Sequence, residues 1–522
     1  MEETLDAFMP LFKKALESGS IKNSSTLLSE KRKICEKLHM YNIPKNGEIL
    51  AILGRSYRRK FYSVLKSKPI RTLSGVTVVA LMTKPYDCPH GVCIFCPGGT
   101  KTNTPQSYTG FEPAARRAKM NDYDPYLQVQ ARLKHYVFMG YVPQKIEIIA
   151  MGGTFTTLPK EYRDEYVMQI YRALNDFPDF NSSVVTNLET QKRTNETADT
   201  RCVAFAIETK PERCGEKEIK ELLDYGVTRV EMGVQSVYDD ILKKNNRGHD
   251  ITDVKEATKI LRDNAYKVDY HAMLNLPFSD MDKDRETIKQ IYSDESFKPD
   301  AIKIYPTLVI KGTALYNMWK EGKYKPYPLE DIIKIIIEAE ATAPHWLRIM
   351  RVERDIPSNL IEEGVKVTNL RQLVSERMAS AGIKAKDIRN REVGHVILSK
   401  KPEIRSKREN YRAADGDEVF LSVEDVANDA IIGFLRLRVA DGSNESLVRE
   451  LHVYGEQKTI ESSDDTGFQH KGFGRELLKE AEQITRNEYS LRHIKIISGV
   501  GVRDYYRKEG YKLERDYMVK EL

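Results

Sequence analysis

The chain has 522 residues and a formal net charge of +6; 31% of its residues are charged and 40% are hydrophobic. This length exceeds one ordinary hydrophobic core, so two or three domains are expected, and the composition excludes a fibrous or disordered protein. No run of about 18 apolar residues occurs, and the start Met1-Glu2-Glu3 lacks the basic and apolar regions of a signal peptide. We therefore expect a soluble, cytoplasmic protein with no membrane partner.

Residues 1–72 are predicted to form a basic helical N-terminal domain. Segment 21–71 holds thirteen Lys or Arg against three Glu, a net charge of +10, so the rest of the chain sums to −4. Aromatic residues alternate with these cations in RSYRRKFY (55–62). Cations beside aromatic rings suit phosphate contacts and stacking on unpaired bases, whereas the alternative is a solvated charged face. The pattern favours nucleic-acid binding.

Six β-rich runs follow, separated by segments long enough for helices. Strands that alternate with helices pair in parallel, because each crossover needs a dozen or more residues. The fold class is therefore α/β, with a partial (β/α)6 barrel over residues 73–314. The predicted strands are 76–82, 145–151, 202–208, 228–235, 267–274 and 301–306.

Residues 315–393 are predicted to be a mainly helical connector, with a helix at 331–342 and no further β/α unit. Residues 394–522 are predicted to be a separate α/β domain. Its expected strands are 395–398, 418–422, 430–438, 447–454, 493–498 and 511–519, with a helix at 472–484.

Three of the six cysteines, Cys88, Cys93 and Cys96, fall within nine residues directly after the first predicted strand. Such clustering is more typical of metal ligation than of disulfides. Three thiolates leave one iron of a [4Fe–4S] cube open to an outside ligand. The alternative is a structural zinc site completed by His90, although structural zinc sites usually draw two ligand pairs from separate segments.

The cysteine loop is one of several long strings that occur in order along the chain. They are CPHGVCIFCPGG (88–99), MGGTF (151–155), TRVEMGVQS (228–236), KIYPTLVI (303–310) and RNREVG (389–394). With these strings the chain resembles the catalytic subunit of Elongator, the third Elongator protein family, whose members pair a radical S-adenosylmethionine (SAM) barrel with an acetyl-CoA-binding domain. The resemblance implies that Cys88, Cys93 and Cys96 hold a [4Fe–4S] cluster, with SAM on the open iron.

The resemblance also implies roles inside the barrel. Gly152 and Gly153 would form the glycine turn against the amino group of SAM, where a strand end must let backbone approach a ligand closely. Glu231 and Gln235 would contact the cofactor from the barrel interior, or else be structural polar residues. Lys145 matches a lysine that the family uses, catalytically, toward acetyl-CoA; without the family it reads as a surface lysine.

The segment QHKGFG (469–474) matches the pyrophosphate loop of GCN5-related acetyltransferases, in which backbone N–H groups at a helix N-terminus bind the cofactor. It follows LVRELHVY (447–454), expected to be the splayed strand of that fold. By resemblance, acetyl-CoA is lined by Glu450, Leu451, His452, Val453, Gln469, Gly472, Phe473, Gly474, Arg475 and Tyr506. Tyr506 would lie near the thioester sulfur, and Glu450 or His452 could act as a base, although both could be plain strand residues.

The Elongator resemblance implies carboxymethylation at C5 of the wobble uridine, U34, in the anticodon region of tRNA. A 5′-deoxyadenosyl radical from SAM would take hydrogen from the acetyl methyl group, and the carbon radical would add to uracil. Elongator-like subunits or self-association are the expected protein partners. Two other classes stay open: a protein lysine acetyltransferase in which the cluster is structural, and a non-catalytic tRNA-binding scaffold. The basic segments 21–71 and 384–412 would repel lysine-rich tails, which counts against the first.

Overall fold

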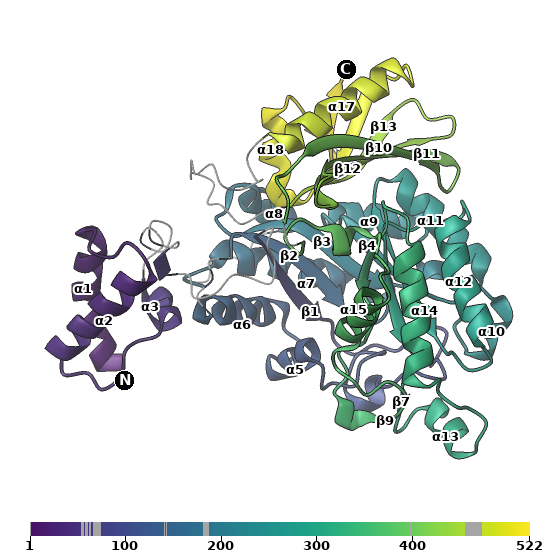
Figure 1. The fold of residues 1–522 in the computed structure, drawn as a ribbon, viewed down its shortest axis with the longest axis horizontal. Coiled ribbons are helices and arrows are strands. Elements are labelled where there is room, and N and C mark those ends of the chain that lie inside the picture. Colours follow the sequence, from purple (N-terminus) through teal and green to yellow (C-terminus); the bar gives the residue numbers. More distant parts are fainter. Residues whose placement is uncertain are drawn as a thin grey trace.

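A computed structural model of the chain describes residues 2–53, 57, 61, 64–65, 75–139, 141, 143–180, 187–396, 399–454 and 472–522. Figure 1 shows a helical N-terminal part at one side, a central sheet flanked by helices, and a C-terminal sheet above it. Within the described ranges, no helix is both long enough and apolar enough to span a membrane. Several predicted residues lie outside these ranges: Arg55, Arg58, Arg59, Lys60, Lys66, Lys68, Arg71 and Gln469.

The N-terminal part is helical, as predicted. Its helices are α1 (Glu2–Glu17), α2 (Ser24–Lys37) and α3 (Asn46–Ile52). They share a small core that includes Phe8 and Phe12. The part docks on the barrel where Gly47 meets α6, since a Cβ at Gly47 would lie 1.7 Å from the carbonyl oxygen of Phe138. Lys31 is one of the thirteen cations of segment 21–71, but it does not face solvent: it is buried and donates to Asn46 Oδ1 at 3.0 Å.

The central sheet is parallel throughout, in the order β1-β2-β3-β4-β5-β6-β8. Its strands are β1 (Val76–Met82), β2 (Lys145–Met151), β3 (Arg201–Thr209), β4 (Arg229–Gln235), β5 (Lys267–Leu274), β6 (Ala301–Pro306) and β8 (Arg348–Arg351). The six predicted strands are confirmed. The expectation that the connector holds no further β/α unit is wrong, because β8 adds a seventh parallel strand to the sheet beside β6.

Helices cover the sheet between successive strands, as parallel pairing requires. They are α5 (Pro113–Met120), α6 (Pro125–Phe138), α7 (Lys160–Asp176), α8 (Leu188–Thr197), α9 (Glu216–Asp224), α10 (Asp239–Lys244), α11 (Ile251–Asp263), α12 (Met281–Ser293), α13 (Ala314–Lys320) and α14 (Leu329–Thr342). Aspartates set several of their starts: the side chains of Asp124, Asp250 and Asp280 each accept a backbone N–H of the first turn.

In the rest of the connector, strand β9 (Ile361–Glu363) pairs with β7 (Val309–Ile310), which lies just before the connector. Helices α15 (Leu370–Ser380) and α16 (Ile388–Arg391) follow. The strand predicted at 395–398 is wrong where the structure describes it, because His395 and Val396 lie in a turn and bend; 397–398 fall outside the described residues.

The C-terminal sheet has the order β10-β11-β12-β13-β14-β16-β15. Its elements are β10 (Ile404–Arg412), β11 (Gly416–Asp425), β12 (Ala430–Ala440), β13 (Ser446–Val453), α17 (Phe473–Asn487), β14 (His493–Ile497), α18 (Arg503–Lys508), β15 (Lys512–Glu514) and β16 (Tyr517–Glu521). Strand β10 was not predicted. Its residues are largely exposed and charged, which fits an edge strand and hides the usual alternation.

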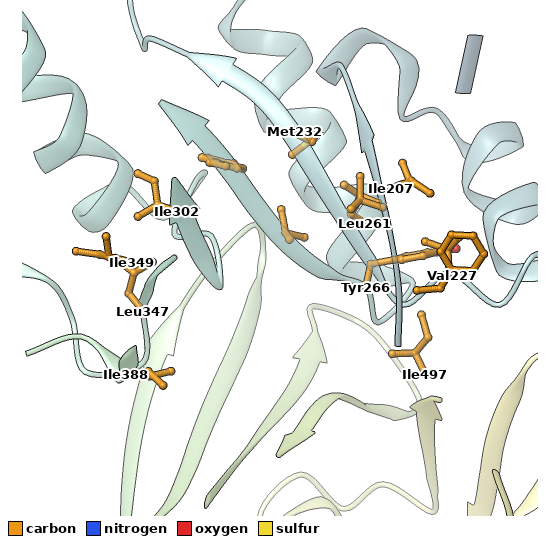
Figure 2. Close-up of a cluster of buried hydrophobic side chains, with 14 of the residues drawn as sticks. Ile207, Val227, Met232, Leu261, Tyr266, Ile302, Leu347, Ile349, Ile388 and Ile497 are labelled. Carbon is orange, nitrogen blue, oxygen red and sulfur yellow. The ribbon is translucent and has the colours of Figure 1, made fainter. Parts of the chain in front are cut away.

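The C-terminal sheet packs against the amino ends of the barrel strands. Arg449 of β13 donates to both carboxylate oxygens of Asp300 at 2.7 Å and to Glu418 at 2.8 Å, and all three side chains are fully buried. The hydrophobic core also runs across this junction: Figure 2 shows Ile497 of β14 below Val227 and Tyr266 of the barrel. Buried charge pairs of this kind fix one relative placement of the two sheets.

Candidate active site

The cysteine loop leaves β1 at the carboxyl end of the barrel strands. Cys93 and Cys96 are buried and Cys88 is half-buried. Cys88 Sγ lies 3.7 Å from Thr154 Oγ1, and Cys96 Sγ accepts the backbone N–H of Ser107 at 3.1 Å. Burial raises the pKa of Cys88, and it raises the pKa of Cys96 to about 11. These thiols therefore keep their protons until a cationic partner replaces them.

The donor set fits a three-cysteine cluster better than a zinc ion. With three cysteines in the loop, tetrahedral zinc would need His90 as its fourth ligand. His90, the fourth ligand of the zinc alternative, has its Nδ1 2.9 Å from Lys210 Nζ and its Nε2 3.3 Å from Cys93 Sγ. A [4Fe–4S] cube instead spreads three cysteines over three irons.

The glycine turn follows β2, beside the cysteine loop. Gly152 and Gly153 both have positive φ, at 140° and 97°. A Cβ at Gly152 would lie 2.1 Å from Thr83 Oγ1, and one at Gly153 would lie 3.3 Å from Gln106 O. Only glycine fits position 152, because a side chain there would collide with Thr83.

Glu231 and Gln235 both lie on β4, but they differ in whether their side chains are free to bind a ligand. Glu231 is fully buried, accepts from Arg229 and His271 at 3.0 Å, and pairs with Lys303. Burial opposes its charge, but Lys303 and Arg229 hold its pKa well below the usual range. Gln235 has an amide oxygen without a partner among the described residues. The structural alternative thus suits Glu231, while Gln235 keeps a free acceptor for a ligand.

Strand β13 splays from β14, as predicted. The two strands pair only over Ser446–Val448, and β13 has a register shift where it faces Arg436 of β12. Residues 449–453 therefore have a strand edge without β14 partners. Unpaired strand backbone of this kind is suited to an extended ligand that offers its own amides.

Two candidate bases lie on this splayed segment. Glu450 accepts from Lys267 and Arg436, both at 2.9 Å; burial disfavours its charge, but these cations lower its pKa to about 2. Burial lowers the pKa of His452, so its imidazole is neutral at pH 7, and its Nε2 has no partner in the described part of the chain. Glu450 is held as a paired carboxylate, whereas His452 offers a neutral nitrogen without a partner among the described residues, which is free to accept a proton. His452 is therefore the stronger candidate.

Tyr506 is buried on α18, with its ring 5.1 Å from that of Tyr505. Burial raises its pKa, so the phenol stays protonated and can only donate or accept a hydrogen bond at neutral pH. Gly472 precedes α17 with a φ of 90°, and, its chain neighbours aside, no atom of the described residues lies within 4 Å of its Cβ position. Gly474 lies close to Tyr505, whose hydroxyl would be 3.1 Å from an added Cβ, and Arg475 pairs with Glu509 at 2.8 Å.

Lys145 begins β2 at the amino end of the barrel. Burial and the nearby Arg201 lower the pKa of its ammonium group. It lies in the interior lining rather than on the outer surface, so the alternative of an ordinary surface lysine is wrong.

One cavity of about 1130 Å³ contains most of the predicted residues. It is lined at one end by Cys88, Cys93, Cys96, Gly153, Glu231 and Gln235, and at the other by Lys145, Glu450, Leu451, His452, Val453 and Tyr506. Gly152, Gly472, Phe473, Gly474 and Arg475 are not part of this lining. The cavity thus joins the carboxyl end of the barrel to the C-terminal sheet.

Several basic residues of the lining were not predicted. They are Arg201, Lys210, Arg247, Lys267, Arg348, Arg351 and Arg354. Lys210 directly follows β3, a position where barrels place functional side chains, so a charged residue at a strand end was a usable signal. The other residues gave no such signal, because a single lysine or arginine is usually a surface residue.

Family models match three parts of the chain. The Radical SAM superfamily matches residues 83–291, the Radical SAM C-terminal domain matches 299–380, and the ELP3 N-terminal domain matches 11–73.

Full-length relatives and a solved structure agree with these models. The chain is 47% identical to the tRNA uridine(34) acetyltransferase of Methanocaldococcus jannaschii, over 94% of this chain and 92% of the relative. It is 40% identical to human Elongator complex protein 3, over 98% and 96% of the two chains. The solved structure of Methanocaldococcus infernus Elp3 with an N-terminal deletion has a TM-score of 0.75 and 42% identity, covering 86% of this chain and all of that one. The chain therefore belongs to the Elongator complex protein 3 (Elp3) family of radical SAM proteins.

Proposed function

We propose that this protein carboxymethylates C5 of the wobble uridine, U34, of tRNA, with SAM and acetyl-CoA as co-substrates. The cavity of about 1130 Å³ carries the proposal, because the cysteines and the splayed strand β13 line the same space. A lysine acetyltransferase does not need a cavity that connects its acetyl-CoA site to three cysteines. The names of the relatives, which include a tRNA uridine(34) acetyltransferase, support the same substrate.

At the barrel end, Cys88, Cys93 and Cys96 would hold a [4Fe–4S] cluster, and the backbone at Gly153 would approach SAM. When bound, the cluster and SAM supply a 5′-deoxyadenosyl radical, able to take hydrogen from an unactivated methyl group. The free amide oxygen of Gln235 would accept a hydrogen bond from SAM.

At the other end, residues 449–453 would pair with the pantetheine arm of acetyl-CoA, and the pyrophosphate would lie at the start of α17. Tyr506 would donate its hydroxyl to the thioester. His452, neutral and unpartnered in the described chain, would take a proton from the water that hydrolyses the thioester once the acetyl carbon is attached to uracil. Hydrolysis leaves the carboxymethyl group.

Uracil would reach the cavity only as an unstacked base, since a stacked one is out of reach of an interior site. Basic lining residues such as Arg201, Arg351 and Arg354 suit the phosphates on either side of U34. The basic N-terminal helices would add contacts elsewhere on the tRNA, where Lys22, Arg32 and Lys33 are exposed.

An anaerobic assay tests the proposal. The reconstituted enzyme is incubated with tRNA, SAM, dithionite and acetyl-CoA, and the tRNA is digested for nucleoside analysis by mass spectrometry. We expect carboxymethyluridine at position 34, and none when SAM or acetyl-CoA is left out. Acetylation of a lysine-rich peptide without any modified uridine would contradict the proposal and support the lysine acetyltransferase alternative.

A further inference from the structure

Two buried cations lie against the cysteine loop. Lys210 follows β3 and is 4% exposed, and Arg247 lies between α10 and α11 and is 6% exposed. Arg247 Nη1 donates to Cys93 Sγ at 3.3 Å, and its Nη2 donates to Gly233 O at 2.5 Å. The guanidinium is thus held between a barrel strand and the sulfur of a candidate iron ligand.

Lys210 reaches the same sulfur through His90. Its ammonium contacts the carboxylate of Glu212, the backbone oxygen of Arg247 and His90 Nδ1, the last at 2.9 Å. An ammonium group only donates, so His90 Nδ1 accepts and Nε2 carries the hydrogen. That Nε2 lies 3.3 Å from Cys93 Sγ, so the imidazole donates to the sulfur. Cys93 therefore receives two N–H groups, each backed by a positive charge.

Close packing fixes this arrangement. Ile94 N donates to Asn245 O at 3.3 Å, and Asn246 Nδ2 donates to Val92 O at 2.8 Å. Gly248 has a φ of 73°, and a Cβ there would lie 2.5 Å from His90 Cβ. Segment 245–248 is therefore docked on the cysteine loop at several points, and Arg247 does not reach Cys93 by a chance rotamer.

The charges at this site do not balance without a further anion. Glu212 pairs with Lys210, but among the described residues no carboxylate pairs with Arg247. A buried cation without a counter-charge is strongly unfavourable. The geometry therefore supplies a place for negative charge on and around Cys93. Thiolate ligands and a reduced iron–sulfur cluster carry negative charge there.

We propose that Arg247 and the Lys210–His90 pair raise the reduction potential of the cluster that the three cysteines hold. One electron from an external reductant adds one negative charge to the cluster, and nearby cations and N–H···S hydrogen bonds stabilise that reduced form. The proposal rests on the cluster assignment made above, and names Arg247, Lys210 and His90 as residues that act through Cys93 rather than on a substrate.

The test is a redox titration of the reconstituted full-length enzyme, with the reduced cluster followed by electron paramagnetic resonance. Arg247→Gln should make reduction at least ten-fold less favourable, a fall of about 59 mV for one electron. Lys210→Gln should shift the potential in the same direction by less, because it acts through His90. Lys244→Gln is the matched control: it removes an exposed lysine of α10 that pairs with Asp240 at 3.5 Å, and should leave the potential unchanged.

Iron and sulfide per chain are measured first. Wild-type enzyme that takes up no cluster would overturn the cluster assignment and the proposal with it. Arg247→Gln with a full cluster and an unchanged potential would overturn the proposal alone. If Arg247→Gln loses its cluster, Lys210→Gln carries the test, and an unchanged potential in Lys210→Gln would overturn the proposal. Loss of the cluster from both variants would also overturn it, because the two cations would then serve cluster assembly.

Discussion

The two ends of the cavity use buried charge differently. At the cysteine end, Arg247 points at a sulfur and has no carboxylate partner in the described chain. At the other end, Arg449 is bound by both Asp300 and Glu418, and Glu450 is bound by Lys267 and Arg436. Unbalanced cations suit a site that must take up negative charge, whereas closed ion pairs suit a junction that must hold two sheets in place.

This difference separates chemistry from positioning. A change at the cysteine end should alter the reaction and leave the fold intact, whereas a change in the closed pairs should alter stability first. The basic N-terminal helices, which we expect to bind tRNA, should form a third class, because α1–α3 lie to one side of both sheets (Figure 1).

The largest effect is expected for Cys93→Ser. It should abolish uridine modification while tRNA affinity stays within about two-fold, because the cluster serves the reaction and phosphate contacts serve binding. Nucleoside analysis and filter binding measure the two quantities. Modified uridine formed by the variant would show that the radical mechanism is wrong.

Arg449→Leu would break the buried ion pairs that Arg449 makes with Asp300 and Glu418. Two buried carboxylates would lose their main partner, which costs about 3 kcal/mol and lowers the midpoint of thermal unfolding by about 6–12 °C. The control Arg408→Leu removes an exposed pair with Glu488 and should change the midpoint little. Equal midpoints for Arg449→Leu and wild type, by circular dichroism, would mean that this network does not hold the sheets together.

A third change concerns acetyl-CoA. Gly472→Glu should weaken binding at least ten-fold, because it places a carboxylate against the pyrophosphate at the start of α17. Gly442→Glu is matched in φ, in surrounding space and in added charge, but lies in the β12–β13 turn. Calorimetry should find normal affinity for this control. If Gly472→Glu binds acetyl-CoA as tightly as the control does, the assignment of residues 469–474 to pyrophosphate binding is wrong.

The smallest effect is expected for tRNA affinity, because other cations remain when four are removed. Alanine at Arg55, Arg58, Arg59 and Lys60 should weaken binding and make its salt dependence shallower, by roughly 0.7–0.9 log units per lost contact for each tenfold change in salt. The control removes four exposed lysines from the barrel helices: Lys217, Lys220, Lys289 and Lys334. Filter binding at two salt concentrations compares them.

Deletion of residues 1–72 should have the same effect in a stronger form and leave the iron content unchanged. A folded four-site variant with wild-type affinity and salt slope would reject the role of this segment in holding tRNA.

The sequence predicted the barrel strands well, because each is a short β-branched run between helices; β1, β2, β5 and β6 have the predicted bounds. It failed for β8 and β10. β8 has four residues with arginine at both ends, and β10 is an exposed edge strand of charged residues, so neither has the apolar pattern that identifies a strand.

The candidate site was predictable only where residues are adjacent in sequence. The cysteine triad is such a case. Lys210 and Arg247 meet that loop from 120 and 154 residues away, Lys210 from the end of β3 and Arg247 from the segment between α10 and α11, so only the tertiary fold brings them to it. Likewise, the pKa difference between Glu450 and His452 depends on Lys267, which belongs to the barrel. The domain boundaries and the roles of the site residues stay predictions.

The most direct test of the shared cavity uses acetyl-CoA with a fully deuterated acetyl methyl group. If the radical formed at the barrel end acts on acetyl-CoA held by β13, one deuterium should pass into 5′-deoxyadenosine and two should remain in the carboxymethyl group on U34. Mass spectrometry of both products after an anaerobic turnover measures this. Modified uridine accompanied by 5′-deoxyadenosine without deuterium would contradict the account.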